Sequence, residues 1–567
     1  MQPRPWPEPS DEITVAVRRM YRGRRAPLPV VIRDELGELF TDEAFSEAFG
    51  QRGRPGWSPG RLALVTALQF AERLTDRQAA EAVRLRIDWK YCLGLGLTDE
   101  GFDHSILCEF RARVAEHGLA EQALDALLAA LVDNGLLKAG GKQRTDSTHV
   151  LAAVRDLNRL ELAGESVRAC LEALAAAAPD WLGEVIDVTG WTARYGVRVD
   201  SWRLPASQTK REALATAYGI DGFTLLHAVY APHAPDWLAR LPAVDVLRRV
   251  LVQNYLVVVD RRGREVIRRR EADTDGLPPG RHRLTSPYDT DARRGGKRDM
   301  FWTGYKLHVS ETCTGPDDSD PDAELPPNII TNVATTDASV PDTAMTGPIH
   351  EGLARRDLLP DGHLVDSGYP SADLLVQSAD RYGISLITPM LADVSAQARA
   401  GAGYDAAAFH VDFDTQKVTC PQGQPSASWS PATQRGTATI VVKFDTDTCR
   451  ACPVRGQCTT ATRSGRQLTI RPRDIHHALA QARARQHTAQ FKQTYKLRAG
   501  VEGTIRQAVA VTDTRHARYR GLAKTHLQHV YSAVALNLIR LDAWFNGVPL
   551  DRTRTSHLTR LEHALAA

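Results

Sequence analysis

A chain of 567 residues is too long for one compact hydrophobic core, which predicts roughly two to four domains. Its 43% hydrophobic and 25% charged residues are typical of a soluble globular protein, and no apolar run approaches the ~18 residues that span a membrane. The net charge of +3 does not by itself indicate a nucleic-acid partner, and no apolar N-terminal stretch marks the chain for secretion. Eight cysteines make no disulfide framework at this length, so we expect a reducing cytoplasm.

The N-terminal part of the chain has a helical pattern. Residues 124–132 place apolar side chains at helical spacing along one face, and Thr75 and Gln78 form the pattern of a capping box. A basic helix is expected around residues 110–114. These short helices predict a helical DNA-binding or dimerisation domain over residues 1–140, organised either around a helix-turn-helix or as a plain helical bundle.

The pattern changes at residues 142–150, whose Thr and Val content predicts a strand. An Ala- and Leu-rich helical stretch follows to about residue 252, and a basic segment with many Gly and Pro extends to about residue 296. Four further strands are expected at residues 304–309, 328–333, 363–366 and 384–388, with a helix at 371–382. Strands that alternate with helices predict an α/β fold with a mixed sheet covered on both faces.

The pattern is irregular from about residue 395 to 473, and this segment contains cysteines. Cys449 and Cys452 form a CxxC pair, with Cys420 before it and Cys458 after it. This spacing is typical of a structural zinc site, whereas four free thiols in a loop-rich segment are the alternative. The rest of the chain is helical in pattern.

Positive charge is concentrated between Arg463 and Lys524, where fourteen Lys and Arg face three acids. Charge of one sign at that density fits a DNA track, although a solvated basic helix face gives the same pattern. Glu502 is the acid in the middle of this run. Arg498 and Arg506 flank it at four-residue spacing, so the three side chains share one helix face.

Three carboxylates occupy positions that suit metal-dependent phosphodiester chemistry. Asp146 lies within the first strand, Asp366 at the carboxyl end of a later strand, and Glu502 on the basic helix. Each one alone is better explained by a cap, a turn or a surface ion pair. Their order on strand, strand and helix instead predicts a two-ion Mg²⁺ (or Mn²⁺) site. Asp337 is an alternative second ligand, but its surroundings are more typical of a turn or helix cap.

Short segments in a consistent order resemble DDE-type insertion-sequence transposases, which have an RNase H-like catalytic core. They are residues 144–148, 304–308, 365–369 and 495–502, together with 102–105 and 110–113 in the helical N-terminus. The resemblance covers about residues 40 to 545. It implies an α/β fold in which an RNase H-like mixed sheet starts at residues 141–152, continues at 297–394 and is completed by the helices of 476–567, with a helical insertion at 153–296 and a Cys-containing insertion at 395–475.

The resemblance also implies site residues. Asp146, Asp366 and Glu502 match the catalytic, metal-binding carboxylates of the family. Its signature of Tyr, Arg, Glu and Lys is matched by Tyr495, Arg498 and Glu502, but Val509 stands where the Lys is expected. DNA contacts are implied for Tyr495 and Arg498 and, in the following basic region, for Arg506, Arg515, Arg518, Arg520 and Lys524.

The implied activity is cleavage of a DNA strand at the ends of an insertion sequence, followed by transfer of the freed 3′-hydroxyl into target DNA. The partners would be the terminal inverted repeats and target DNA, both double-stranded, with no membrane partner. The acting form would be a homodimer in the cytoplasm, at the nucleoid. Two alternatives stay open: an inactive or domesticated relative that binds DNA as a regulator, and a metal-dependent nuclease without strand transfer.

Overall fold

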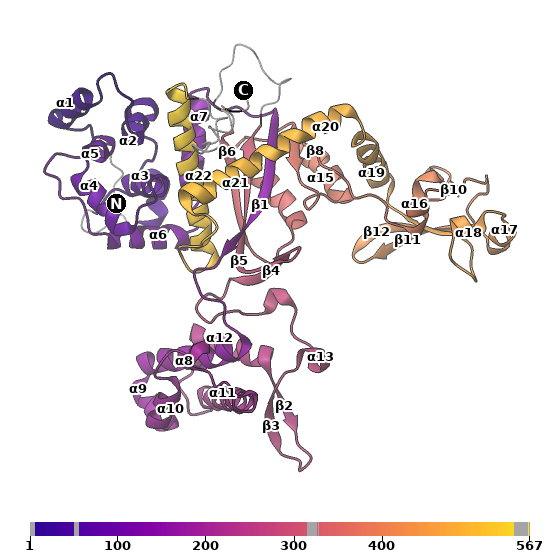
Figure 1. Ribbon diagram of the computed structural model, residues 1–567, viewed down its shortest axis with the longest axis horizontal. Coiled ribbons are helices and arrows are strands. Elements are labelled where there is room, and N and C mark those ends of the chain that lie inside the picture. The colour runs from indigo at the N-terminus through magenta and orange to yellow at the C-terminus, as the bar shows by residue number, and fades with distance from the viewer. Residues whose placement is uncertain (1–5, 50–55, 314–325, 327, 549–564, 566–567) are drawn as a thin grey trace.

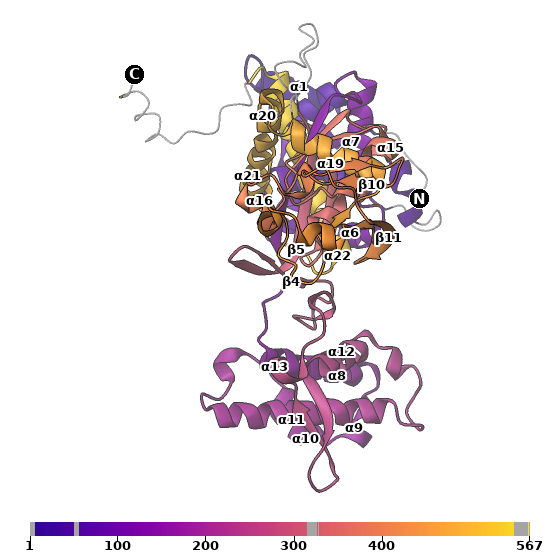
Figure 2. The same ribbon diagram turned by 90° about the vertical axis from the view of Figure 1, so that its right-hand side faces the viewer.

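The computed structural model describes residues 6–49, 56–313, 326, 328–548 and 565. Figure 1 shows the N-terminal helices on one side of the long helix α22 (Leu522–Phe545) and the main sheet on its other side. A helical insertion lies below the sheet, as Figure 2 also shows, and a Cys-bearing module lies at the far end of a helical bridge. In the described residues, no helix is both long enough and apolar enough to cross a membrane.

The N-terminal helices form one bundle against α22. They are α1 Asp11–Met20, α2 Leu28–Val31, η1 Ile32–Leu36, η2 Glu43–Ala48, α3 Pro59–Ala71, α4 Asp76–Leu85, α5 Ile87–Leu93, α6 Ser105–Glu116 and α7 Gln122–Asp133. The predicted capping box of Thr75 and Gln78 is confirmed, and the predicted apolar stripe is the buried face of α7 except at Val132, which is exposed. On the predicted basic helix, now α6, Arg111 is buried and pairs with Asp76, so this arginine is not available to a partner.

The main sheet is mixed, and its strands run in the order β6-β5-β1-β7-β8. The bounds are β1 Lys142–Leu151, β4 Arg293–Lys297, β5 Met300–Thr312, β6 Ile330–Asp337, β7 Gly362–Val365 and β8 Ser385–Ile387. β5 is antiparallel to its neighbours, whereas β1, β7 and β8 are parallel to one another. At Gly304 the backbone has a φ of +150° and passes so close to β1 that a side chain would collide with the carbonyl of Val150. All five strands predicted for this sheet are therefore confirmed.

Two apolar cores hold the sheet. The larger core continues from the N-terminal bundle through α22 to Tyr305 and Leu307 of β5 and to Ile330 of β6. The side chain of Asn537 in α22 both donates to and accepts from the backbone of Ile330, which fixes the helix on the strand. The smaller core packs η6 (Asp342–Met345) and α14 (Thr346–Arg355) against β7 and β8, and α15 (Ala372–Tyr382) lies beside them.

The insertion between β1 and β4 has a hydrophobic core of its own. Its elements are α8 Arg159–Ala177, α9 Pro179–Val185, α10 Val188–Tyr195, η3 Ser201–Arg203, α11 Gln208–Val229, η4 Leu238–Arg240, α12 Pro242–Asn254, β2 Tyr255–Val259, β3 Glu265–Arg269, α13 Ala272–Asp275 and η5 Gly280–His282. The antiparallel hairpin β2–β3 was not predicted. β2 begins directly after α12, with only Gln253 and Asn254 between their apolar runs, and periodicity alone does not separate a short strand from a helix end.

The segment predicted to be irregular is instead a small β module, so that prediction was wrong. Its elements are α16 Ala396–Ala400, η7 Ala406–Ala408, β9 His410–Asp412, β10 Lys417–Thr419, β11 Ser428–Gln434, β12 Thr437–Lys443, α17 Thr446–Arg450, α18 Arg455–Cys458 and β13 Gln467–Ile470. Phe409, Val418, Val442 and Leu468 form its core. The strands are short and rich in Thr, Ser and Gln, which explains the weak strand pattern.

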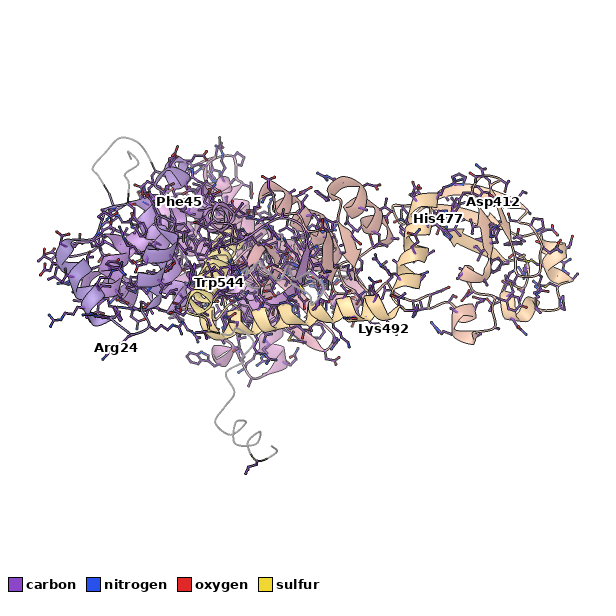
Figure 3. All side chains as sticks on the ribbon, turned by 90° about the horizontal axis from the view of Figure 1, so that it is seen from above. Arg24, Phe45, Asp412, His477, Lys492 and Trp544 are labelled. Carbon is purple, nitrogen blue, oxygen red and sulfur yellow. The ribbon has the colours of Figure 1, made fainter. Side chains whose placement is uncertain are left out.

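A chain of helices returns from this module to the sheet. They are α19 Arg473–Arg485, α20 Ala489–Lys496, η8 Leu497–Ala499 and α21 Gly500–Thr512, followed by α22. Figure 3 shows Lys492 on this helical bridge, between the main body and the module that carries Asp412. The fold is therefore mixed α/β, with a central sheet, a helical N-terminus and two insertions.

Candidate active site

Asp146 and Asp366 lie side by side because their strands are parallel neighbours. The register of β1 and β7 pairs Thr145 with Val365, so Asp146, the next residue of β1, lies beside Asp366, which directly follows β7. Burial raises the pKa of Asp146, and the charge of Asp366 raises it further, against the hydrogen bond from the Ser147 backbone and the charge of Arg498. Two carboxylates thus lie at neighbouring interior strands of the sheet, and their like charges repel each other.

Arg498 joins Asp146 to Glu502. Its guanidinium donates to Asp146 Oδ2 at 3.0 Å and to Glu502 Oε1 at 2.7 Å. Arg498 lies on η8, where a 3₁₀ turn separates α20 from α21, and Glu502 lies in the first turn of α21. The Glu502 side chain is 61% exposed, whereas that of Asp146 is 11% exposed. One carboxylate is thus fixed in the sheet and the other reaches from the surface.

Tyr495, the first residue of the sequence signature, lies near Arg498 and the carboxylates. Burial raises the pKa of Tyr495, and the charges of Asp366, Asp146 and Glu502 raise it further, although Arg498 opposes them. The ring of Tyr495 stacks on Phe491, with centroids 5.6 Å apart. All three carboxylates that the sequence singled out therefore contribute to the raised pKa of this one tyrosine.

A buried ion-pair network holds η8 and α21 against the sheet. Arg144 of β1 pairs with Glu311 at 2.6 Å and donates to the carbonyl of Leu497 in η8 at 2.7 Å. Its guanidinium lies against Gly500, where any side chain would collide with it. Glu311 is fully buried and also pairs with Arg540 of α22 at 3.0 Å. The position of Glu502 thus depends on charges in the core behind it.

Asp342 is a fourth carboxylate at this site, and the sequence reasoning missed it. It accepts hydrogen bonds from Ser147 Oγ at 3.0 Å and from Lys306 Nζ at 2.9 Å. Burial opposes its charged form, but the hydrogen bond and charge of Lys306 outweigh burial and lower the pKa of Asp342. It follows Val340-Pro341 in a turn, where nothing in the sequence distinguishes it from Asp337.

The alternative ligand Asp337 is held elsewhere. Its Oδ1 accepts from the backbone N–H of Ser339 at 2.8 Å and from the Ser339 hydroxyl at 2.5 Å. This carboxylate stabilises the turn after β6, in agreement with the sequence interpretation.

Buried polar side chains continue behind the aspartates. Tyr369 is fully buried and its hydroxyl lies 2.7 Å from His308 Nδ1. Burial raises the pKa of Tyr369 well above its usual value, and the charges of Asp342, Asp146 and Asp366 add to the effect. Tyr369 therefore stays protonated, and its side chain adds no charge next to the carboxylates.

The donor chemistry fits a hard divalent cation, because the three predicted ligands supply only carboxylate oxygens. Their positions do not form a coordination shell. Within the described parts of the chain, no group of three or more His, Cys, Asp and Glu is arranged to hold a metal ion. The Arg498 guanidinium takes the place between Asp146 and Glu502 that a shared cation would need.

The predicted DNA-binding residues are distributed unevenly around this site. Arg515 reaches β1, with its Nε 3.3 Å from the Thr148 hydroxyl. Arg506 and Lys524 are exposed. Arg518 packs over the ring of Phe70 at 4.8 Å, and Arg520 lies over that of Tyr288 at 5.7 Å. Arg506 and Lys524 are therefore accessible to a phosphate, whereas Arg515 is half-buried against β1 and Arg518 is a packing residue of the N-terminal bundle.

The four predicted zinc ligands converge on one small cavity of about 40 Å³ in the β module, lined by Cys420, Cys449, Cys452 and Cys458. Backbone N–H groups donate to two of the sulfurs, from Gln424 to Cys420 at 3.4 Å and from Arg466 to Cys449 at 3.5 Å. Burial raises the pKa of Cys458, and the other three thiols add to the effect while Arg466 opposes it. No disulfide bond joins any of the cysteines in the part of the chain that the structure describes.

Comparison with known families gives two matches. A family model described as "Transposase DDE domain" matches residues 419–542, and one described as "Transposase domain (DUF772)" matches residues 24–113. No curated protein and no solved structure matches the chain. The first match contains Glu502 and Arg498, whereas Asp146 and Asp366 lie outside both. The two aspartates are brought together by the parallel pairing of β1 and β7, which neither family match covers.

Proposed function

From the premise that this chain is an insertion-sequence transposase of the DDE type, we propose that it cuts DNA at the ends of its element and joins the freed 3′-hydroxyl to target DNA. The observation that carries the proposal is the meeting of Asp146, Asp366 and Glu502 at the parallel strands β1 and β7. The strand order, with the second strand antiparallel and the others parallel, supports an RNase H-like core. A dimer is the proposed acting form, because two ends must be joined.

In this proposal Asp146, Asp366 and Glu502 would hold Mg²⁺ or Mn²⁺. The bound ions would activate the attacking oxygen and stabilise the leaving oxygen of the phosphodiester. The sheet fixes the two aspartates before DNA arrives, so little reorganisation is needed there. Glu502 is exposed and sits at a helix start, so it is the ligand that adjusts when Arg498 releases it.

Arg498, Arg506 and Arg515 would then receive the phosphates. Arg498 and Arg506 lie one turn before and one turn after Glu502, and Arg515 touches β1 two residues from Asp146. A guanidinium binds a phosphate through two parallel hydrogen bonds, which suits it to orienting the scissile group. Arg515 takes the role that the signature lysine would have had at Val509.

The test is cleavage of labelled duplex carrying the element's own ends, with Mg²⁺, by wild type, Asp366→Asn and Asp337→Asn. We expect wild type and Asp337→Asn to cut at the end boundary, because Asp337 serves only a turn. Asp366→Asn should bind the duplex and not cut it. Cleavage by Asp366→Asn would remove this residue from the site, and binding without cleavage by wild type would indicate a regulator instead.

We also propose that Cys420, Cys449, Cys452 and Cys458 bind one structural zinc ion. Their convergence on one cavity and the N–H···S hydrogen bonds support it, and zinc would draw the four sulfurs inward. Metal analysis of the purified chain should find about one zinc per chain. Cys452→Ser should lose it and Cys108→Ser, a change of an exposed cysteine in α6, should retain it. Zinc-free wild type with a folded β module would end this proposal.

A further inference from the structure

The helical insertion ends in an arginine-rich hairpin that projects away from the rest of the molecule (Figure 1). Residues 261–270 contain six arginines and one glutamate. At the turn, Arg261 and Arg262 are exposed, and neither has a carboxylate partner among the described residues. Arg264 differs, because Asp260 pairs with it at 2.9 Å. The tip therefore presents two positive charges that the protein itself does not neutralise.

A second group of arginines lies at the base of the same hairpin. Arg159 starts α8, Arg269 ends β3 and Arg270 follows it, while Arg283 comes from the segment after η5. Burial lowers the pKa of Arg159, and the charges of Arg269, Arg270 and Arg283 lower it further, although Tyr255 opposes them. Like charges this close repel one another, so the fold holds a concentration of positive charge here at a cost to its own stability.

Hydrogen-bond donors in this cluster are unused. The Nε atoms of Arg270 and Arg283 are buried and have no hydrogen-bond partner within the described structure. Arg159 donates only to uncharged acceptors, the Asn254 side chain at 3.0 Å and the Arg270 carbonyl at 2.9 Å. Buried donors without a partner are rare in proteins and mark places where a ligand or water completes the bonding.

The positive surface continues from the hairpin toward the sheet. The Arg293 side chain of β4 donates to the carbonyl of Arg281 in η5 at 2.7 Å, which connects the insertion to the sheet edge. Beyond it, Arg294 and Lys297 of β4 and Arg298 in the following turn are exposed. Cations distributed along an extended arm suit an extended polyanion such as duplex DNA better than they suit a small anion.

We propose that this arm, residues 255–298, binds the phosphate backbone of duplex DNA, with Arg261 and Arg262 at its tip and the cluster of Arg159, Arg269, Arg270 and Arg283 at its base. This inference rests on the proposed function, which brings duplex DNA to the sheet edge, and adds the second surface that holds it. Arginine suits the role because its planar fork pairs with phosphate oxygens. The contacts go to the backbone, so they position the duplex without reading its sequence.

The experiment measures binding of the full-length chain to a labelled duplex of random sequence over a series of salt concentrations. The variants are Arg261→Ala/Arg262→Ala at the tip and Arg269→Gln/Arg283→Gln at the base. A matched control, Lys210→Ala/Arg211→Ala, removes two exposed charges from α11 of the same insertion. Each lost phosphate contact should reduce the slope of log K against log salt by about 0.9. We therefore expect both arm variants to lose about 1.8 of that slope and the control to lose none.

If wild type binds the duplex and both arm variants keep its salt slope, the proposal that the arm binds DNA is wrong, and the proposed function still stands. Failure of wild type to bind duplex at all would overturn both. Normal DNA binding together with loss of self-association in the arm variants would show that the arm meets protein instead, which also overturns the inference. The tip variant changes only exposed side chains, so its result does not depend on the stability of the base cluster.

Discussion

Two arginine-rich segments of this chain use their charge in opposite ways. In the segment from Arg463 to Lys524, several arginines meet acids or carbonyls of the protein itself. Arg471 pairs with Asp373 at 2.5 Å, and Arg498 pairs with both Asp146 and Glu502. In the arm, the arginines at the tip and base have no carboxylate partner in the described structure. Charge density in the sequence is similar in the two segments, but pairing decides which charge is left for a polyanion.

The cause of the difference is what surrounds each segment. The first connects the β module to the sheet and packs along α15, β1 and the N-terminal bundle, so its long side chains find partners. The second stands away from the body on a hairpin, where no other element approaches its tip (Figure 2). An arginine folded against a carboxylate must exchange that partner before it binds DNA, whereas an unpaired arginine needs no exchange.

The largest expected effect comes from removing Glu311, because its buried pairs with Arg144 and Arg540 hold the helices of the paired segment against the sheet. Glu311→Ala leaves Arg144 and Arg540 buried without their counter-charge, which typically costs about 3–5 kcal/mol of stability. The urea midpoint of unfolding measures it. The control Glu351→Ala removes an exposed pair with Arg381 and should cost at most about 1 kcal/mol. Equal midpoints for the two variants would show that the buried network does not stabilise the fold.

The sequence predicted the sheet well because its strands are short apolar runs between clear turns. Asp366 was found for the same reason, since it directly follows a strand, and Asp146 lies within the strand that runs parallel to it. Asp342 was missed because it reaches the site only through the pairing of β6 with β5, and no pattern in the sequence around Asp342 indicates that pairing. The Arg498 pair with Asp146 joins residues 352 positions apart, which no spacing rule predicts.

A smaller effect is expected from Arg498→Ala, which removes a paired arginine from the carboxylates. Arg498 competes with a cation for Asp146 and Glu502 through charge-assisted hydrogen bonds, typically worth about 1.5–3 kcal/mol. The variant should therefore bind Mn²⁺ roughly tenfold or more tightly, as measured by the paramagnetic resonance of free Mn²⁺. Arg506→Ala, exposed on the same helix, is the control and should bind Mn²⁺ like wild type. Equal affinities in all three proteins would mean that Arg498 does not occupy the cation position.

The smallest expected effect is a difference in DNA binding between Arg506 and Arg518, two arginines twelve positions apart that were both predicted to contact DNA. Arg506 is exposed with no acidic partner in the described structure, whereas Arg518 packs over Phe70 and donates to the carbonyl of Leu74. Arg506→Ala should reduce the salt slope of duplex binding by about 0.9, the value for one lost phosphate contact. Arg518→Ala should leave the slope unchanged and lower the melting temperature instead, because it removes packing from the N-terminal bundle. If Arg518→Ala flattens the slope as much as Arg506→Ala does, pairing in the free protein does not determine which arginines bind DNA, and the contrast between the two segments fails.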